Sequence, residues 1–281
     1  MRVRAEVHGA ISIVNGIAAG KGATLGIGLR VIAEAEAVPG RGIVIESPGR
    51  RLSSRLITKT IERSVPRREL DRNKLRISLD SEIPTGYGLK SSSAISTSVA
   101  LACMGLFGKP EDSKVLMAGV RASIETKVSI TGAYDDACAC YYGGFAVTDN
   151  YKKRLVRSEK APSDLGILIF IPRGKRRGKP LKLRPIKGAF EAAWSMAKRA
   201  DYWGAMLVNG LAAAPILGPD PELLVRLMER GALGASVSGN GPAVAAVVRK
   251  GQMGAVRKVF SDEGRIITSS VNNRKADVRE L

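Results

Sequence analysis

The chain has 281 residues, with 45 lysines and arginines against 26 aspartates and glutamates, for a formal charge of +19. This excess favours anionic partners, either nucleic acid or small molecules carrying phosphate or carboxylate groups. Hydrophobic residues make up 44% and charged residues 25%, as in a globular protein. No apolar run approaches the roughly 20 residues of a membrane span, and the first residues lack a signal-peptide pattern. We therefore expect a cytoplasmic protein with no membrane partner.

The cysteine and histidine content argues against several kinds of site. Cys103, Cys138 and Cys140 are too few for a disulfide framework, and His8 is the only histidine. A structural zinc site needs further ligands, and Ser-His-Asp or Cys-His chemistry needs a histidine beside the nucleophile. We predict small buried thiols without a metal-binding role.

The first half of the chain predicts strands followed by helices. Segments rich in Val and Ile with period-two alternation predict strands at residues 2–15, 27–38, 42–47 and 74–79. A short basic helix is expected between the last two. Helical periodicity follows at residues 91–106, ended by Gly108-Lys109-Pro110, and at about 111–127. A short helix at 136–142 and a strand at 143–150 complete this half.

The polar residues 151–164 predict a domain boundary, with domains at 1–155 and 156–281. The second half then predicts a strand at 165–172 and helical regions at 186–217 and 220–230. Two strands around a glycine turn follow at 232–249, and a helix at 251–263 and a strand at 265–271 complete the chain. We expect an α+β protein whose two halves share a cleft.

The densest basic segment, residues 172–185, has seven basic and no acidic side chains. We interpret it as a solvated loop. A nucleic-acid-binding arm is the alternative, but the segment has no interleaved aromatic residues on which bases could stack.

The stretch PTGYGLKSSSA, residues 84–94, stands at the start of the 91–106 helix. The first N–H groups of a helix have no helical partners and, with the helix dipole, form an anion site. Gly86 and Gly88 would let backbone amides approach a phosphate, Lys90 would add positive charge, and a serine hydroxyl could reach a phosphate-bound Mg²⁺. A plain capped helix after a turn is the alternative.

Two better-known phosphate loops are excluded. The dinucleotide fingerprint needs a third glycine where Ser91 stands. Residues 16–24, GIAAGKGAT, imitate a Walker loop but are one residue short, and Gly22 stands where Ser or Thr should follow the lysine. We expect 16–24 to be a flexible loop that faces the substrate.

Three motifs in order resemble the GHMP kinases, the superfamily of galactokinase, homoserine kinase, mevalonate kinase and phosphomevalonate kinase. They are PTGYGLKSSSA, the segment ASIETKVSITGAYDDACACYYGG, and SVSGNGPAVAAV at 236–247. Lys90 departs from the pattern, because a glycine is usual there. NGIAAGKGATLGIG and ITGAYDDACACYYGGFAVTDN narrow the resemblance to the archaeal shikimate kinases.

The resemblance implies a two-domain GHMP kinase fold, with an N-terminal half like ribosomal protein S5 domain 2 and a ferredoxin-like C-terminal half. It implies ATP-dependent phosphorylation of the shikimate 3-hydroxyl, with Mg²⁺, in aromatic amino acid biosynthesis. The implied ATP-binding residues are Pro84, Thr85, Gly86, Tyr87, Gly88, Leu89, Lys90, Ser91, Ser92, Ser93 and Ala94.

Carried over without gaps, the resemblance places the metal ligands at Ser92 and Glu125 and the catalytic aspartate at Asp136. The local pattern of a hydrophobic residue before the aspartate favours Asp135 instead. Capping of the 136–142 helix is the alternative for both aspartates, and a solvated helix face is the alternative for Glu125.

Several family members place an N-terminal lysine near the transferred phosphate, and this chain has no counterpart before Gly20. Lys21 comes too late for a gapless match and is kept as a candidate substrate contact. The cation that binds the shikimate carboxylate is not identified. Homoserine or mevalonate as acceptor is the runner-up, and a non-catalytic nucleic-acid-binding protein is the alternative of another class.

Overall fold

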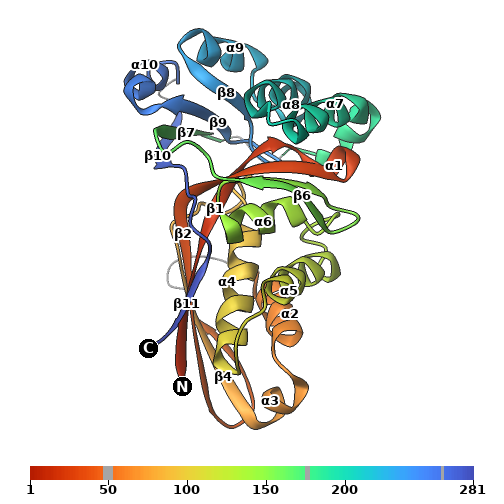
Figure 1. The fold of residues 1–281 in the computed structure, drawn as a ribbon, viewed down its shortest axis with the longest axis vertical. Helices are drawn as coiled ribbons and strands as arrows, with labels where there is room; N and C mark the ends of the chain where they lie inside the picture. Colours follow the sequence, from red (N-terminus) through yellow and green to blue (C-terminus); the bar gives the residue numbers. More distant parts are fainter. Residues whose placement is uncertain (47–52, 175–177, 261–262) are drawn as a thin grey trace.

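The computed structural model describes residues 1–46, 53–174, 178–260 and 263–281. Two antiparallel-rich sheets stand one above the other, and the long strand β1 runs from the first towards the second (Figure 1). The N- and C-termini lie side by side at the far end of the first sheet. No helix within the described ranges is long and apolar enough to cross a bilayer.

Among the described residues, the first sheet has seven strands, in the order β11-β1-β2-β4-β3, with β5 on β2 and β6 on β5. Along residues 2–8 of β1 the burial alternates, so this part of the sheet has one core face and one open face, whereas residues 9–14 are all buried. The helices of the first half cover the core face (Figure 1), and helices of the second half also pack against β1, β2 and β5. The strands are β1 (Arg2–Val14), β2 (Lys21–Pro39), β3 (Gly42–Glu46), β4 (Asn73–Ser81), β5 (Phe145–Asp149), β6 (Arg154–Glu159) and β11 (Asp277–Glu280).

The helices of this half are α1 (Gly16–Ala19), α2 (Ser54–Ser64), α3 (Arg67–Arg72), α4 (Ser91–Leu106), α5 (Asp112–Glu125) and α6 (Tyr134–Tyr142). The central helix α4 is buried on nearly every side, because it packs against β1 and β2 on one side and against α2 and α5 on the other. This packing fixes the position of its N-terminus.

The second sheet has the order β10-β7-β9-β8, and every neighbouring pair is antiparallel. Its elements are β7 (Leu165–Pro172), η1 (Pro180–Ile186), α7 (Lys187–Lys198), α8 (Tyr202–Leu217), α9 (Pro221–Glu229), β8 (Ala232–Val237), β9 (Val244–Arg249), η2 (Lys250–Gln252), α10 (Met253–Arg257) and β10 (Gly264–Ser270). Numbered along the chain within this half, the strands lie side by side in the order 4-1-3-2. This is the ferredoxin-like arrangement.

The two halves share a hydrophobic core. Along β7, Ile167 and Ile169 belong to the cluster that fills the first half, while Leu168 and Phe170 belong to a second cluster under α9. Because successive strand residues point to opposite faces, one face of the second sheet continues the core of the first half. The junction between the halves is therefore a rigid place in which to build a site.

Most predicted elements are confirmed, and the differences have physical reasons. The basic helix is two helices, α2 and α3, interrupted at Pro66; residues 47–52 lie outside the described part. The expected flexible loop at 16–24 is wrong, since Asn15 caps one turn of helix and β2 begins at Lys21. The terminal strand β11 was not predicted.

The predicted boundary between residues 155 and 156 falls inside β6, which pairs with β5. The sheets divide after Glu159, and β11 then returns to pair with β1. Within the basic segment 172–185, residues 175–177 lie outside the described part; η1 is mostly exposed, with Leu183 buried.

Candidate active site

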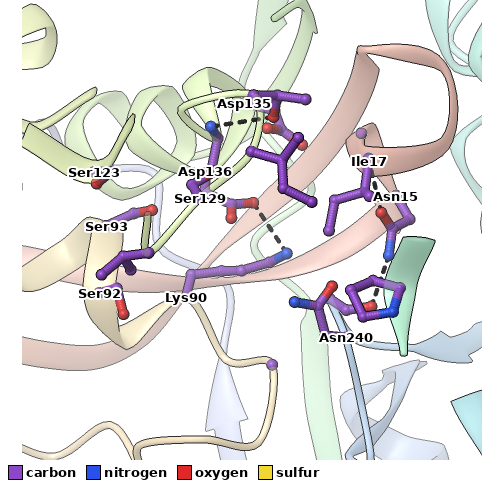
Figure 2. Close-up of a pocket in the computed structure, with 18 of the residues that line it drawn as sticks. Asn15, Ile17, Lys90, Ser92, Ser93, Ser123, Ser129, Asp135, Asp136 and Asn240 are labelled. Carbon is purple, nitrogen blue, oxygen red and sulfur yellow. Dashed lines mark hydrogen bonds and ion pairs between the residues drawn. The ribbon is translucent and has the colours of Figure 1, made fainter. Parts of the chain in front are cut away.

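A cavity of about 410 Å³ lies where the two halves meet. Its walls are the N-terminal ends of α4 and α6, the loop around α1, and the glycine loop between β8 and β9 (Figure 2). Residues of all three GHMP-like motifs line it.

The N-terminus of α4 forms one wall. Ser91, Ser92 and Ser93 line the cavity with the first turn of the helix. The N-cap residue is Lys90, which makes no capping hydrogen bond, since a lysine side chain has no acceptor atom. The first N–H groups of this 16-residue helix therefore receive no side-chain cap from Lys90, and a phosphate at this helix start stays a prediction.

The predicted loop, residues 84–94, does not face the cavity as a whole. Gly86, Gly88, Leu89, Lys90 and the three serines line it. Ala94 is fully buried, and Pro84 and Tyr87 border a separate hollow beside β7.

The two loop glycines have different tasks. A Cβ at Gly86 would meet nothing within 4 Å, whereas a Cβ at Gly88 would lie 1.9 Å from the Ser238 carbonyl oxygen. The Ser238 hydroxyl also donates to the Gly88 carbonyl at 2.9 Å. Gly88 therefore allows the third motif to clamp the loop, and Gly86 leaves room for a ligand.

Asp135 and Asp136 lie in the first turn of α6 and both line the cavity. Ala133 is the N-cap of that helix, and neither aspartate occupies the capping position. The side chain of Asp135 is buried, and its Oδ1 accepts a hydrogen bond from Asn150 Nδ2 at 2.8 Å. Thr24 donates to its backbone carbonyl at 2.8 Å. The acid pair is thus fixed by strands β2 and β5.

Two glycines of the N-terminal motif make room for this carboxylate. A Cβ at Gly22 would lie 2.1 Å from Asp135 Oδ2, and one at Gly16 would lie 2.4 Å from Asn150 Nδ2. Any larger residue at either position would collide with the pair.

Burial raises the pKa of Asp135 well above the usual range of a carboxyl, and the neighbouring charge of Asp136 raises it further. The Lys90 charge and the hydrogen bond from Asn150 act in the opposite direction.

Lys90 does not point at the loop amides. Its ammonium lies 3.0 Å from Asp136 Oδ1 (Figure 2). It also donates a hydrogen bond to the Ser12 hydroxyl at 2.7 Å. The sequence predicted a positive charge for the phosphates, and the structure instead directs that charge to the acid pair.

Two predicted residues are not brought to the cavity wall. Glu125, at the end of α5, forms an ion pair with Arg63 of α2 and is not among the lining residues. Lys21 lies with its ammonium 5.2 Å from the centroid of the Trp194 ring, also away from the lining. Their roles as metal ligand and substrate contact stay predictions.

Sequence reasoning missed Ser12, Asn15, Asn150 and Asn240. Asn15 donates to the Gly239 carbonyl at 2.7 Å, and so ties α1 to the third motif. Asn240 lines the cavity, and within the described part of the chain its buried Oδ1 has no hydrogen-bond partner. Asn15, Asn150 and Asn240 lie within the quoted motifs but were given no role there, and Ser12 lies outside them.

Comparison with known proteins places this arrangement in a family. Residues 55–144 match the model of the GHMP kinases N terminal domain. The shikimate kinase of Methanosarcina acetivorans is 37% identical over 279 residues, covering 95% of this chain and 93% of the relative. The shikimate kinase of Methanothrix thermoacetophila is 36% identical, covering 98% and 96%.

The chain belongs to the archaeal shikimate kinase family of GHMP kinases. Solved structures agree on the fold: homoserine kinase from Cytophaga hutchinsonii has a TM-score of 0.76 at 19% identity, covering 99% of this chain and 97% of that one. Mevalonate kinase from Methanococcus jannaschii has a TM-score of 0.77 at 17% identity, covering 96% and 98%. This GHMP kinase uses ATP, and its two-domain α+β fold is the one that the sequence predicted.

Proposed function

We propose that this GHMP kinase transfers the γ-phosphoryl group of ATP to the 3-hydroxyl group of shikimate, giving shikimate 3-phosphate and ADP. The observation that carries the proposal is the meeting, in one cavity, of a free helix N-terminus and a buried carboxylate pair, in a chain at least 30% identical to archaeal shikimate kinases over nearly its full length.

The phosphates of ATP bind against the first N–H groups of α4, next to Gly86. Phosphoryl transfer depends chiefly on positioning and on stabilising the charge that develops on the transferred group. A helix N-terminus provides both, because its N–H groups are fixed before the substrate arrives.

The acceptor hydroxyl faces Asp136, which is the more accessible of the two aspartates and is held in place by Lys90. As the new oxygen–phosphorus bond forms, the hydroxyl proton passes to Asp136. The bond from the γ-phosphorus to the bridging oxygen breaks, and ADP leaves. Asp135, held by Asn150, orients its neighbour.

The cavity suits an acceptor with several hydroxyl groups. The Asn240 Oδ1 atom is an acceptor without a partner in the described residues. A buried polar atom left unpaired is costly, and a second hydroxyl of shikimate would satisfy it.

A magnesium ion carried by ATP would find Ser92 on the cavity wall, while Glu125 is paired with Arg63 outside the lining. Among the described residues, no cluster of three or more His, Cys, Asp or Glu could hold a metal alone. Mg²⁺ usually keeps several waters and binds through one or two carboxylates together with substrate phosphates. Ser92 and Glu125 would hold it, with Glu125 leaving its ion pair with Arg63. The ion would neutralise charge on the phosphates.

An ADP-release assay with purified protein, Mg·ATP and one acceptor at a time tests the proposal. Shikimate, homoserine and mevalonate are compared at equal concentrations. We expect the highest kcat/KM for shikimate. A higher value for homoserine or mevalonate would overturn the choice of acceptor and leave the kinase assignment in place.

A further inference from the structure

Lys90 is buried inside the cavity, and its ammonium contacts Asp136 and Ser12. Its side chain is 7% exposed, and its ammonium bridges Asp136 Oδ1 at 3.0 Å and Ser12 Oγ at 2.7 Å. An ammonium is rarely buried unless it is paired. The pairing, rather than solvent, therefore decides where this charge lies.

The backbone at Lys90 is adapted to this position. The residue has φ +63° and ψ +22°, in the left-handed region that glycine adopts most easily. A lysine is strained there, so its side chain has a role that glycine could not fill. Lys127 also has a positive φ, of +58°, and lines the same cavity, but it is exposed.

Ser12 links this ammonium to the other half of the protein. Its hydroxyl oxygen accepts from Lys90 and also, at 2.9 Å, from the Gly239 N–H group of the glycine loop. The Ser12 N–H group in turn donates to the Ser238 hydroxyl at 3.3 Å. Ser12 thus connects the loop at 84–94, through Lys90, with the third motif, and Lys90 in turn contacts Asp136.

We propose that Lys90 is a positioning residue for phosphoryl transfer: its ammonium holds the Asp136 carboxylate oriented towards the acceptor, and it anchors that carboxylate through Ser12 to the loop at 238–242. The inference rests on the proposed function only in taking Asp136 as the group that faces the acceptor. If Lys90 positions Asp136, its loss should change turnover and the pH dependence of turnover. If Lys90 contacted the phosphates directly, its loss should instead change the affinity for ATP.

In the part of the chain that the structure describes, Lys90 is the cation that forms an ion pair with Asp136. The Lys90 charge lowers the pKa of the buried Asp135 carboxyl, so removing it moves the ionisation of Asp135 to higher pH. The titratable groups that face Asp135 are Asp136, Lys90, Lys153, Cys138 and Cys140. Burial keeps both thiols neutral by raising their pKa, and the Lys153 ammonium is already engaged by the carbonyls of Thr131 and Asn150.

The test compares Lys90→Gly, Lys90→Arg and the matched control Lys127→Gly. Both glycine variants remove one lysine from a left-handed position, so they share the change in backbone strain and in net charge. Each is assayed for kcat and for the KM of ATP, with kcat/KM for the acceptor measured from pH 5 to 9. A thermal melt confirms that each variant is folded.

We expect Lys90→Gly to lower kcat by about 10- to 100-fold at neutral pH and to leave the KM of ATP within about threefold. The acidic limb of its pH profile should move up by about one to three pH units, the usual effect of an opposite charge within 4–6 Å. Lys90→Arg, which keeps the charge, should keep the limb in place, as should Lys127→Gly. Butylammonium, which matches the deleted side chain, should restore part of the turnover, and butanol should not.

A large rise in the KM of ATP with an unmoved pH profile would overturn the proposal in favour of a direct phosphate contact. Equal profiles for Lys90→Gly and Lys127→Gly would also overturn it. If Lys90→Gly does not fold, a shifted limb in the Lys90→Arg variant would contradict the proposal by itself. A failure of the proposed function can be distinguished from a failure of this inference. The ADP-release screen of the wild-type protein shows which acceptor is phosphorylated, and all Lys90 and Lys127 variants can then be assayed with that acceptor.

Discussion

Gly22 is the position where one methyl group should separate stability from catalysis. It lies on β2 opposite Thr148 and its φ is not in the left-handed region, so alanine fits the backbone there. The added Cβ, however, would lie 2.1 Å from Asp135 Oδ2 and 2.5 Å from its Cγ. Gly22→Ala is therefore a steric probe of the acid pair.

The size of the effect follows from these distances. Real Cβ atoms do not approach other atoms within 3.0 Å, so the Asp135 carboxylate has to retreat by about 0.9 Å. Asn150 holds it at 2.8 Å on its other side, so the movement breaks that hydrogen bond or displaces the start of α6. We expect a loss of about 1–3 kcal/mol in unfolding free energy, as for other overpacked cores. We also expect a fall of about 10²-fold in kcat, as for a 1 Å misplacement of a catalytic group.

The assay is steady-state ADP release with shikimate, together with denaturant unfolding of the same samples. Gly28→Ala is the matched control, because it lies on the same strand and the nearest atoms to its Cβ would be the Ser270 and Ser269 hydroxyls, at 3.0 and 3.4 Å, and the Ser270 carbonyl oxygen at 3.7 Å. We expect that variant to stay within about twofold of wild-type kcat. If folded Gly22→Ala protein matches it, the position of Asp135 does not matter for turnover and the reasoning is refuted.

Three further predictions concern the carboxylates. Asp136→Asn should lower kcat by about 10²–10⁴-fold with ATP binding retained; a larger loss for Asp135→Asn would move the base by one residue, and no loss in either would reject the carboxylate mechanism. Glu125→Gln should raise the Mg²⁺ concentration for half-maximal activity, whereas Arg63→Gln, which frees this carboxylate, should not; wild-type behaviour of Glu125→Gln across the titration would leave Glu125 only its ion pair. Asp135→Asn should flatten the fall of the melting temperature as pH rises above about 4, because the raised pKa of Asp135 lets the folded protein keep a proton that the unfolded chain has lost; a fall parallel to that of wild type would contradict this.

Local sequence predicted the glycine loop and the helix start at the proposed phosphate site, since their determinants are neighbours in the chain. The glycine spacing, the three serines and the start of a helix all lie within 84–94, and the structure places the helix start at Ser91, as expected. The strands and helices of the ferredoxin-like half were predicted for the same reason: alternation and periodicity are properties of short segments.

What could not be predicted depends on contacts between distant segments. The burial of Asp135 results from Gly22 and Thr24, more than a hundred residues earlier, and from Asn150. Gly88 looked like a phosphate contact, but the space beside it is filled by Ser238. No periodicity encodes these meetings, since each needs the two sheets to be assembled first.

Two departures from the GHMP pattern have one explanation if Lys90 positions the acid pair. The sequence has a lysine in place of the usual loop glycine, and it has no lysine before Gly20 where several family members place one. In the structure, the Lys90 ammonium extends from the loop at 84–94 into the cavity and pairs with Asp136. The cavity therefore contains a cation although the N-terminal segment supplies none. Small residues can then occupy that segment, and Gly16 and Gly22 leave space for Asn150 and Asp135. The cost is a left-handed lysine, about 1–2 kcal/mol for a residue other than glycine, and the buried ion pair with Asp136 offsets it because either charge alone would be far more costly to bury. A substitution that removes the charge of Lys90 should therefore be tolerated by the fold only when Asp136 is neutralised with it or when the conformational strain is removed at the same time, as in Lys90→Gly.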